Sequence, residues 1–185
     1  MKKVFIIHGW GGSPDSNWFP WMKKELEKEN IEVVAPQMPN ADFPRMGEWL
    51  SFMRQIIGKA DENVFLIGHS LGVIAILCYL ESLKEDEKIG GIVLAAGFSQ
   101  SIGIPEIENF FETGIEYEKI KNSVEKIVII NSDNDPYVPL EQGKIMEEKL
   151  GGKLVVLHNA FHINEGNGYF EFPVGLEKLK IIFNT

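Results

Sequence analysis

Six short apolar runs alternate with segments of helical period, and this alternation constrains the fold more than any other feature of the chain. The runs are rich in valine and isoleucine and mostly lack polar alternation, which is typical of strands covered on both faces. They comprise residues 3–8, 31–36, 63–68, 89–96, 126–131 and 153–158. Strand and helix repeated in this way predict a parallel sheet with helices on both faces, a three-layer α/β/α sandwich.

Apolar residues between the runs recur at helical spacing and predict amphipathic helices. One stripe comprises Met46, Trp49, Leu50, Met53 and Ile57, and another comprises Leu176, Leu179 and Phe183. Residues 71–80 differ because they are apolar nearly all round, which predicts a central, buried helix. Cys78 lies in this helix, and we expect a core residue rather than a reactive thiol, since nothing nearby in sequence would lower its pKa.

The longest interval between runs covers residues 98–124 and allows two interpretations. One is an ordinary crossover helix over residues 104–111 with a preceding turn, and the other is a small flap over a pocket; either is followed by a second helix from Glu116. At 185 residues the chain has no length for a lid domain. We therefore interpret residues 1–185 as a single domain.

A Gly-x-Ser-x-Gly string stands between the third run and the buried helix, at residues 68–72. A turn this tight strains the serine and leaves no room for side chains two positions on either side, so glycine is required there. The string in a strand–turn–helix context predicts a nucleophile elbow with Ser70 as the nucleophile.

A serine nucleophile needs a base that is itself oriented by an acid. His162 follows the sixth run in a loop and is the favoured base, with His158 at the end of that run as the alternative. Asp135 follows the fifth run and precedes a proline that rigidifies the turn, so it is favoured over Asp133 as the acid. The resulting order Ser-Asp-His is the chain order of α/β-hydrolases.

The glycine-rich loop after the first run, residues 8–13, supplies the remaining part of such a site. We assign the oxyanion hole to the backbone N–H groups of Trp10 and Leu71. A central first strand gives the sheet order 2-1-3-4-5-6, so the loop and the elbow would flank the same crevice. The substrate pocket is assigned to residues beside these motifs: Gly9, Trp10, His69, Phe98, Tyr137 and Phe161.

Four segments together resemble a known family. They are residues 68–72, the turn at residues 134–139, the pair Phe161-His162 and the aromatic segment at residues 17–21. They are similar to the small, lidless serine hydrolases related to retinoblastoma-binding protein 9, over nearly the whole chain. The resemblance implies an α/β-hydrolase core without the first two strands, with Ser70, Asp135 and His162 as the triad.

Two positions depart from that family. Phe161 stands where the family often has glycine before the histidine. The Leu-x-Cys-x-Glu string associated with retinoblastoma binding is absent around Cys78, so that partner is not implied.

These observations predict a carboxylesterase-like serine hydrolase that cleaves a small ester, thioester or amide through an acyl-enzyme. The alternative is a non-catalytic binding protein on a hydrolase fold, since fold alone does not imply function. Dinucleotide binding by the glycine loop fails because Pro14 stands where the third glycine would be, and no ribose-binding acid follows the second run. Acyl length, ester against amide preference and oligomeric state are left open.

Charge and cysteine content limit the partners. The net charge of −9, with no cluster of lysine or arginine, argues against nucleic acid and anionic membranes. One cysteine permits no intrachain disulfide and no thiolate zinc cluster, and we expect neither a metal nor a cofactor. The apolar run at residues 4–7 is too short for a signal peptide, so we expect a cytoplasmic protein.

Overall fold

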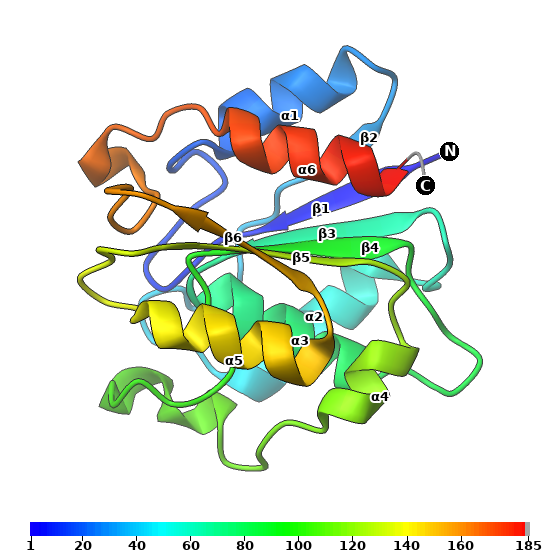
Figure 1. The fold of residues 1–185 in the computed structure, drawn as a ribbon. Helices are drawn as coiled ribbons and strands as arrows, with labels where there is room; N and C mark the ends of the chain where they lie inside the picture. The colour runs from blue at the N-terminus through cyan, green and yellow to red at the C-terminus, as the bar shows by residue number, and fades with distance from the viewer. Residues whose placement is uncertain (184–185) are drawn as a thin grey trace.

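The computed structural model describes residues 1–183, which contain one sheet of six parallel strands (Figure 1). The strands are β1 (Lys3–Ile7), β2 (Glu32–Val34), β3 (Val64–His69), β4 (Gly91–Ala95), β5 (Ile127–Ser132) and β6 (Lys153–Leu157). Their order is β2-β1-β3-β4-β5-β6, and every neighbouring pair is parallel. The predicted sheet and its order are confirmed, although β2 and β4 are shorter than their apolar runs.

Helices cover both faces of the sheet, so the predicted three layers are confirmed (Figure 1). On one face lie α1 (Phe19–Glu27) and α6 (Pro173–Phe183), and on the other α2 (Met46–Ile57), α3 (Leu71–Glu81), α4 (Tyr117–Asn122) and α5 (Leu140–Leu150). Each face has its own cluster of buried apolar side chains against the sheet. None of the helices within residues 1–183 is long and apolar enough to cross a membrane.

The central helix α3 is buried from Leu71 to Leu80, as its uniform apolarity predicted. Cys78 is a core residue on this helix, and burial raises the pKa of its thiol to about 12. The thiol is therefore protonated at neutral pH and has no nucleophilic role.

The segment after β4 does not contain an ordinary crossover helix over residues 104–111. It forms a short 3₁₀ helix, η1 (Pro105–Phe110), and the second helix expected from Glu116 is α4. Glycines with positive φ before and after η1, Gly103 and Gly114, interrupt the helical conformation. The side chain of Asn109 fixes η1 to the start of α2, since Oδ1 accepts from Met46 N–H and Nδ2 donates to Pro44 O. Within the described chain there is no separate lid domain.

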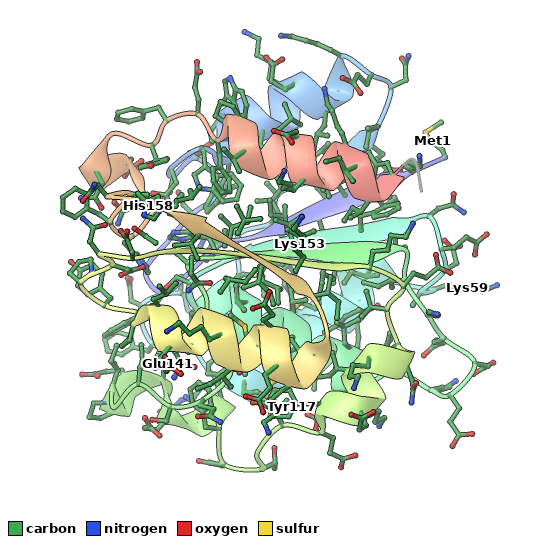
Figure 2. The ribbon with its side chains drawn as sticks, viewed as in Figure 1. Met1, Lys59, Tyr117, Glu141, Lys153 and His158 are labelled. Carbon is green, nitrogen blue, oxygen red and sulfur yellow. The ribbon has the colours of Figure 1, made fainter. Side chains whose placement is uncertain are left out.

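The carboxyl ends of the strands bring the predicted motifs to one edge of the sheet. Ile7 pairs with Gly68, so the glycine-rich loop after β1 lies beside the elbow after β3. Ser132 pairs with Leu157, so the loops after β5 and β6 also lie side by side. Figure 2 shows His158, at the end of β6, on the side of the molecule opposite Lys59. This edge, where the strand order reverses, is where ligands bind in open α/β sheets.

Candidate active site

The elbow between β3 and α3 holds Ser70 in a strained backbone conformation. Its φ of 55° and ψ of −121° lie in a region that non-glycine residues rarely occupy. A Cβ on Gly68 would stand 2.8 Å from Ile76 Cδ1, and one on Gly72 would stand 2.2 Å from the carbonyl oxygen of Ile7. The two glycines are therefore required for the close packing of strand and helix, and the turn leaves the Ser70 hydroxyl at the surface of two cavities.

A buried aspartate–histidine pair lies beside the elbow. Asp135 Oδ2 is 2.7 Å from His162 Nδ1, and Asp135 Oδ1 accepts from the N–H groups of Tyr137 and Val138. The carboxyl side chain is fully buried and the imidazole is 9% exposed. Because a carboxylate only accepts, Nδ1 carries the proton of the neutral ring, and Nε2 keeps a lone pair.

Ser70 and His162 line the same two cavities, but no hydrogen bond joins them. Over residues 1–183 neither the Ser70 hydroxyl nor His162 Nε2 has a hydrogen-bond partner. Catalytic hydrogen bonds of this kind are often long or poorly aligned before substrate binds. Proton transfer between the two groups therefore requires the serine and the imidazole to move closer together.

His69 contacts His162 and fixes its backbone. Its Nε2 donates to the carbonyl oxygen of His162 at 2.8 Å, and the two rings lie 4.9 Å apart. Burial, with a smaller contribution from His162, lowers the pKa of His69 to about 3. The His69 ring is therefore neutral at neutral pH, and it fixes the backbone of the loop that carries His162.

The glycine-rich loop presents an unused backbone donor beside the serine. The Gly9 carbonyl accepts from His8 Nδ1 at 2.7 Å and from Gly12 N–H at 3.1 Å. A trans peptide points its N–H and C=O in opposite directions, so the N–H of Trp10 is turned away from these two donors. A Cβ on Gly9 would stand 3.0 Å from Ser70 Cβ, so this peptide lies directly against the elbow.

Two further observations concern the backbone N–H groups assigned to the oxyanion hole, those of Trp10 and Leu71. His8 Nε2 accepts from Met38 N–H at 3.0 Å, which leaves the ring proton on Nδ1 for the Gly9 carbonyl, and burial lowers the pKa of His8. Leu71 is the first residue of α3, where backbone N–H groups have no partner within the helix. In the described part of the chain neither Trp10 N–H nor Leu71 N–H has an acceptor, and both residues line a cavity with Ser70.

The two cavities that meet at Ser70 differ in chemistry. One, of about 250 Å³, is mainly apolar, and its walls include Leu71, Phe98, Ile102, Ile104, Ile107 and Tyr137. The other, of about 350 Å³, is mainly polar, and its walls include Gly9, Ser16, Asn17, His69, Asn164 and Glu165. Trp10, Ser70 and His162 line both.

Most of the residues assigned to the pocket from sequence line one of these cavities, but Phe161 lines neither. Its side chain is 46% exposed and its backbone has a φ of 49°. This left-handed conformation is one that glycine adopts more readily than an L-residue.

The alternative acid and base form a separate pair that does not line the two cavities. Asp133 Oδ2 is 2.6 Å from His158 Nδ1, and the His158 side chain is 80% exposed. Asp133 Oδ1 accepts from Asn159 N–H, and this bond, followed by the one to His158, lowers the pKa of the Asp133 carboxyl.

Sequence reasoning missed two groups of cavity residues. The isoleucines at 102, 104 and 107 come from the segment for which a crossover helix and a flap over a pocket were both left open. The polar group includes Asn17 and Glu165, which are 148 positions apart and exchange two hydrogen bonds. The one available signal was that Glu165 follows His162 by three residues in the same loop.

Comparison with known proteins gives the family of the chain. The family model described as serine hydrolase matches residues 4–181. YdeN of Bacillus subtilis is 32% identical over 184 residues, covering 99% of this chain and 97% of the relative. Serine hydrolase RBBP9 of Rattus norvegicus is 28% identical over 157 residues, covering 82% of each.

Solved structures give the same result for the fold. The crystal structure of the B. subtilis ydeN gene product superposes with a TM-score of 0.94 at 31% identity, covering 100% of both chains. Est1E from Butyrivibrio proteoclasticus superposes with a TM-score of 0.76 at 13% identity, covering 100% of this chain and 89% of the other, which is a likeness of fold alone. The chain has the α/β-hydrolase fold and belongs to the serine hydrolase family.

Proposed function

We propose that this chain is a carboxylesterase-like hydrolase that cleaves small esters, thioesters or amides through a covalent acyl-enzyme on Ser70. The observation that carries the proposal is the buried hydrogen bond of 2.7 Å between Asp135 and His162, formed beside a strained serine elbow. Structural ion pairs are found throughout proteins, but a buried pair next to a serine at a strained elbow is the arrangement that acyl transfer needs.

The first half of the reaction forms the acyl-enzyme. Ser70 Oγ attacks the carbonyl carbon of the substrate while His162 Nε2 takes the hydroxyl proton. The carbonyl oxygen becomes an oxyanion, and the N–H groups of Trp10 and Leu71 donate to it. The bond to the leaving group then breaks, and His162 returns its proton to the departing oxygen, sulfur or nitrogen.

Water completes the second half. It attacks the acyl ester, gives one proton to His162, and the bond to Ser70 breaks as the serine recovers that proton. The overall reaction converts substrate and water into a carboxylic acid and an alcohol, thiol or amine. Asp135 stays ionised throughout, holds the imidazole tautomer and stabilises the imidazolium that forms transiently.

The oxyanion hole must stabilise a negative charge on a protein that is itself strongly negative. With a formal charge of −9, the surface as a whole opposes a developing negative charge. Two oriented backbone N–H groups offset this locally, and removal of one such donor costs about 3 kcal/mol in related chemistry. The loop fixed by His8 is therefore a part of the catalytic machinery that contains no reactive side chain of its own.

A fluorophosphonate probe together with hydrolysis of p-nitrophenyl butyrate tests the proposal. We expect the wild type to be labelled and to cleave the ester, and Ser70→Ala to lose both properties. Ser51→Ala, which removes an exposed hydroxyl on α2, is the matched control and retains both.

Labelling that survives in Ser70→Ala would refute the nucleophile assignment. A wild type that neither reacts with the probe nor cleaves any activated ester would instead favour a binding protein on this fold. The missing hydrogen bond between Ser70 and His162 is the structural observation on the side of that second candidate.

A further inference from the structure

The two cavities give the site two unequal halves. Phe98, Ile102 and Ile107 contribute only apolar atoms to one cavity, whereas Asn17, Glu165 and their neighbours contribute polar atoms to the other. A carbonyl carbon attached to Ser70 carries its oxygen and two substituents, the acyl chain and the leaving group. The cavities therefore separate these two substituents.

The backbone donors indicate which substituent enters which cavity. Trp10 and Leu71 both line the apolar cavity, but only Trp10 lines the polar one. An oxyanion held between the two N–H groups places the acyl chain, bonded to the same carbon, in the apolar cavity. The polar cavity is walled by His162 and by residues 164–166 of the same loop. His162 lines both cavities, and since the acyl chain takes the apolar one, a leaving group that receives its proton from His162 takes the polar one.

One formal charge faces the leaving-group side. Among the described residues that line either cavity, Glu165 is the sole carboxylate, and no lysine or arginine is present. Glu165 Oε2 accepts from Asn17 N–H at 2.8 Å, and Glu165 N–H donates to Asn17 Oδ1 at 3.0 Å. These two bonds hold the carboxylate at the cavity without neutralising its charge.

We propose that the polar cavity binds the leaving group and that Glu165 selects leaving groups with a positive charge over neutral or anionic ones. This inference rests on the proposed hydrolase activity and adds the substrate class to it. The substrate is then an ester or amide with a short apolar acyl chain and a cationic, ammonium-bearing alcohol or amine. An acidic leaving group such as a phosphorylated alcohol is repelled by Glu165 and by the net charge of −9.

Two butyrate esters of the same shape test this selection: butyrylcholine, with a quaternary ammonium, and 3,3-dimethylbutyl butyrate, with an uncharged carbon in its place. At low ionic strength we expect kcat/KM to favour the choline ester by about three- to five-fold, which is the size of an exposed charge interaction. Added salt should reduce this preference, because it screens exposed charges.

Glu165→Gln isolates the charge, because the amide oxygen still accepts from Asn17 N–H. The variant should cleave the two esters at equal rates. Glu85→Gln removes an exposed carboxylate from the loop before β4, away from both cavities, and should keep the wild-type preference. Equal melting temperatures show that the variants are folded.

A third ester, methyl 4-(trimethylammonio)butyrate, moves the cation to the acyl side and should be cleaved more slowly than methyl 5,5-dimethylhexanoate, its uncharged analogue. The reverse order would overturn the assignment of the cavities. Equal rates for butyrylcholine and its analogue in the wild type would overturn the role of Glu165, as would cleavage of p-nitrophenyl butyrate without cleavage of either ester. Failure to cleave p-nitrophenyl butyrate would instead contradict the hydrolase activity itself.

Discussion

Two aspartate–histidine pairs come from the same two loops and have nearly the same hydrogen-bond length, but they lie in opposite environments. The inner pair, Asp135 with His162, is 2.7 Å long and almost fully buried. The outer pair, Asp133 with His158, is 2.6 Å long, and its two side chains are 33% and 80% exposed. Hydrogen-bond length alone therefore does not distinguish the pair that we propose as catalytic from the surface pair; burial and the presence of Ser70 do.

The outer pair belongs to a set of contacts that holds the loop carrying His162. Three consecutive N–H groups of residues 159–161 donate to side chains of the preceding loop. The acceptors are Asp133 Oδ1, Ser132 Oγ and Asn134 Oδ1, at 2.9, 3.0 and 2.8 Å. We infer that these loop residues position the base, whereas His162 of the inner pair transfers the proton.

We expect the largest difference between the two pairs when each histidine is exchanged for alanine. His162→Ala should lower kcat for p-nitrophenyl butyrate by about 10⁵- to 10⁶-fold, the loss typical of a triad histidine. His158→Ala should stay within about two-fold of wild type, since exposed ion pairs contribute little. The measurement is steady-state hydrolysis with burst titration of active sites, and comparable losses in both variants would contradict separate roles.

The acids should differ nearly as much. Asp135→Asn keeps its acceptor for the N–H groups of Tyr137 and Val138 but turns an amide donor toward His162, which stabilises the wrong imidazole tautomer. We expect kcat to fall by about 10⁴-fold, with little change in the melting temperature. Asp133→Asn still accepts from Asn159 N–H and should lose less than about three-fold. An Asp135→Asn variant with wild-type activity would show that another group orients the base.

The sheet could be predicted from sequence because its strands are covered by helices on both faces. Such strands appear in the sequence as short apolar runs without polar alternation. The sequence also predicted the three residues Ser70, Asp135 and His162 as neighbours, since the carboxyl ends of parallel strands meet at one edge. Their geometry in the structure agrees with that proximity, and their roles remain predictions until the variants above are measured.

The parts that sequence did not predict depend on backbone conformation. Periodicity at residues 104–111 suggested an α-helix, but Pro105 and the flanking glycines limit this stretch to a short 3₁₀ helix. The pairing of Asn17 with Glu165 joins loops at opposite ends of the chain, and no local pattern encodes such a contact. Phe161 was placed in the pocket by its position next to His162, but it has a positive φ and lines neither cavity.

The pH dependence of unfolding should also differ between the buried histidine beside the inner pair, His69, and the exposed histidine of the outer pair, His158. His69 is hydrogen-bonded to the His162 carbonyl oxygen of the inner pair. The pKa of His69 falls from 6.5 to about 3 on folding, so between these pH values the unfolded chain binds more protons than the folded one. The contribution of His69 to the free energy of unfolding is therefore complete above about pH 6.5. It is lost as the pH falls toward 3, by at most about 1.4 kcal/mol per pH unit. His69→Gln should flatten urea-unfolding stability between pH 6 and 4, whereas His158→Gln should leave the slope unchanged. Identical slopes in all three proteins would show that His69 does not carry this linkage.

The smallest expected effect lies at Phe161, between the outer and the inner histidine. Its φ of 49° costs an L-residue roughly 1–2 kcal/mol, whereas glycine adopts this conformation freely but loses about 0.5–1 kcal/mol in backbone entropy on folding. Phe161→Gly and Phe161→Ala both remove the ring, so their difference isolates the strain, and the glycine variant should be more stable by about 0.5–1 kcal/mol in urea unfolding. Ala160→Gly is the control, because Ala160 has no positive φ and glycine should destabilise there. If alanine at 161 proved as stable as glycine, the loop would have to adopt an ordinary backbone conformation without losing the bond between His162 and Asp135.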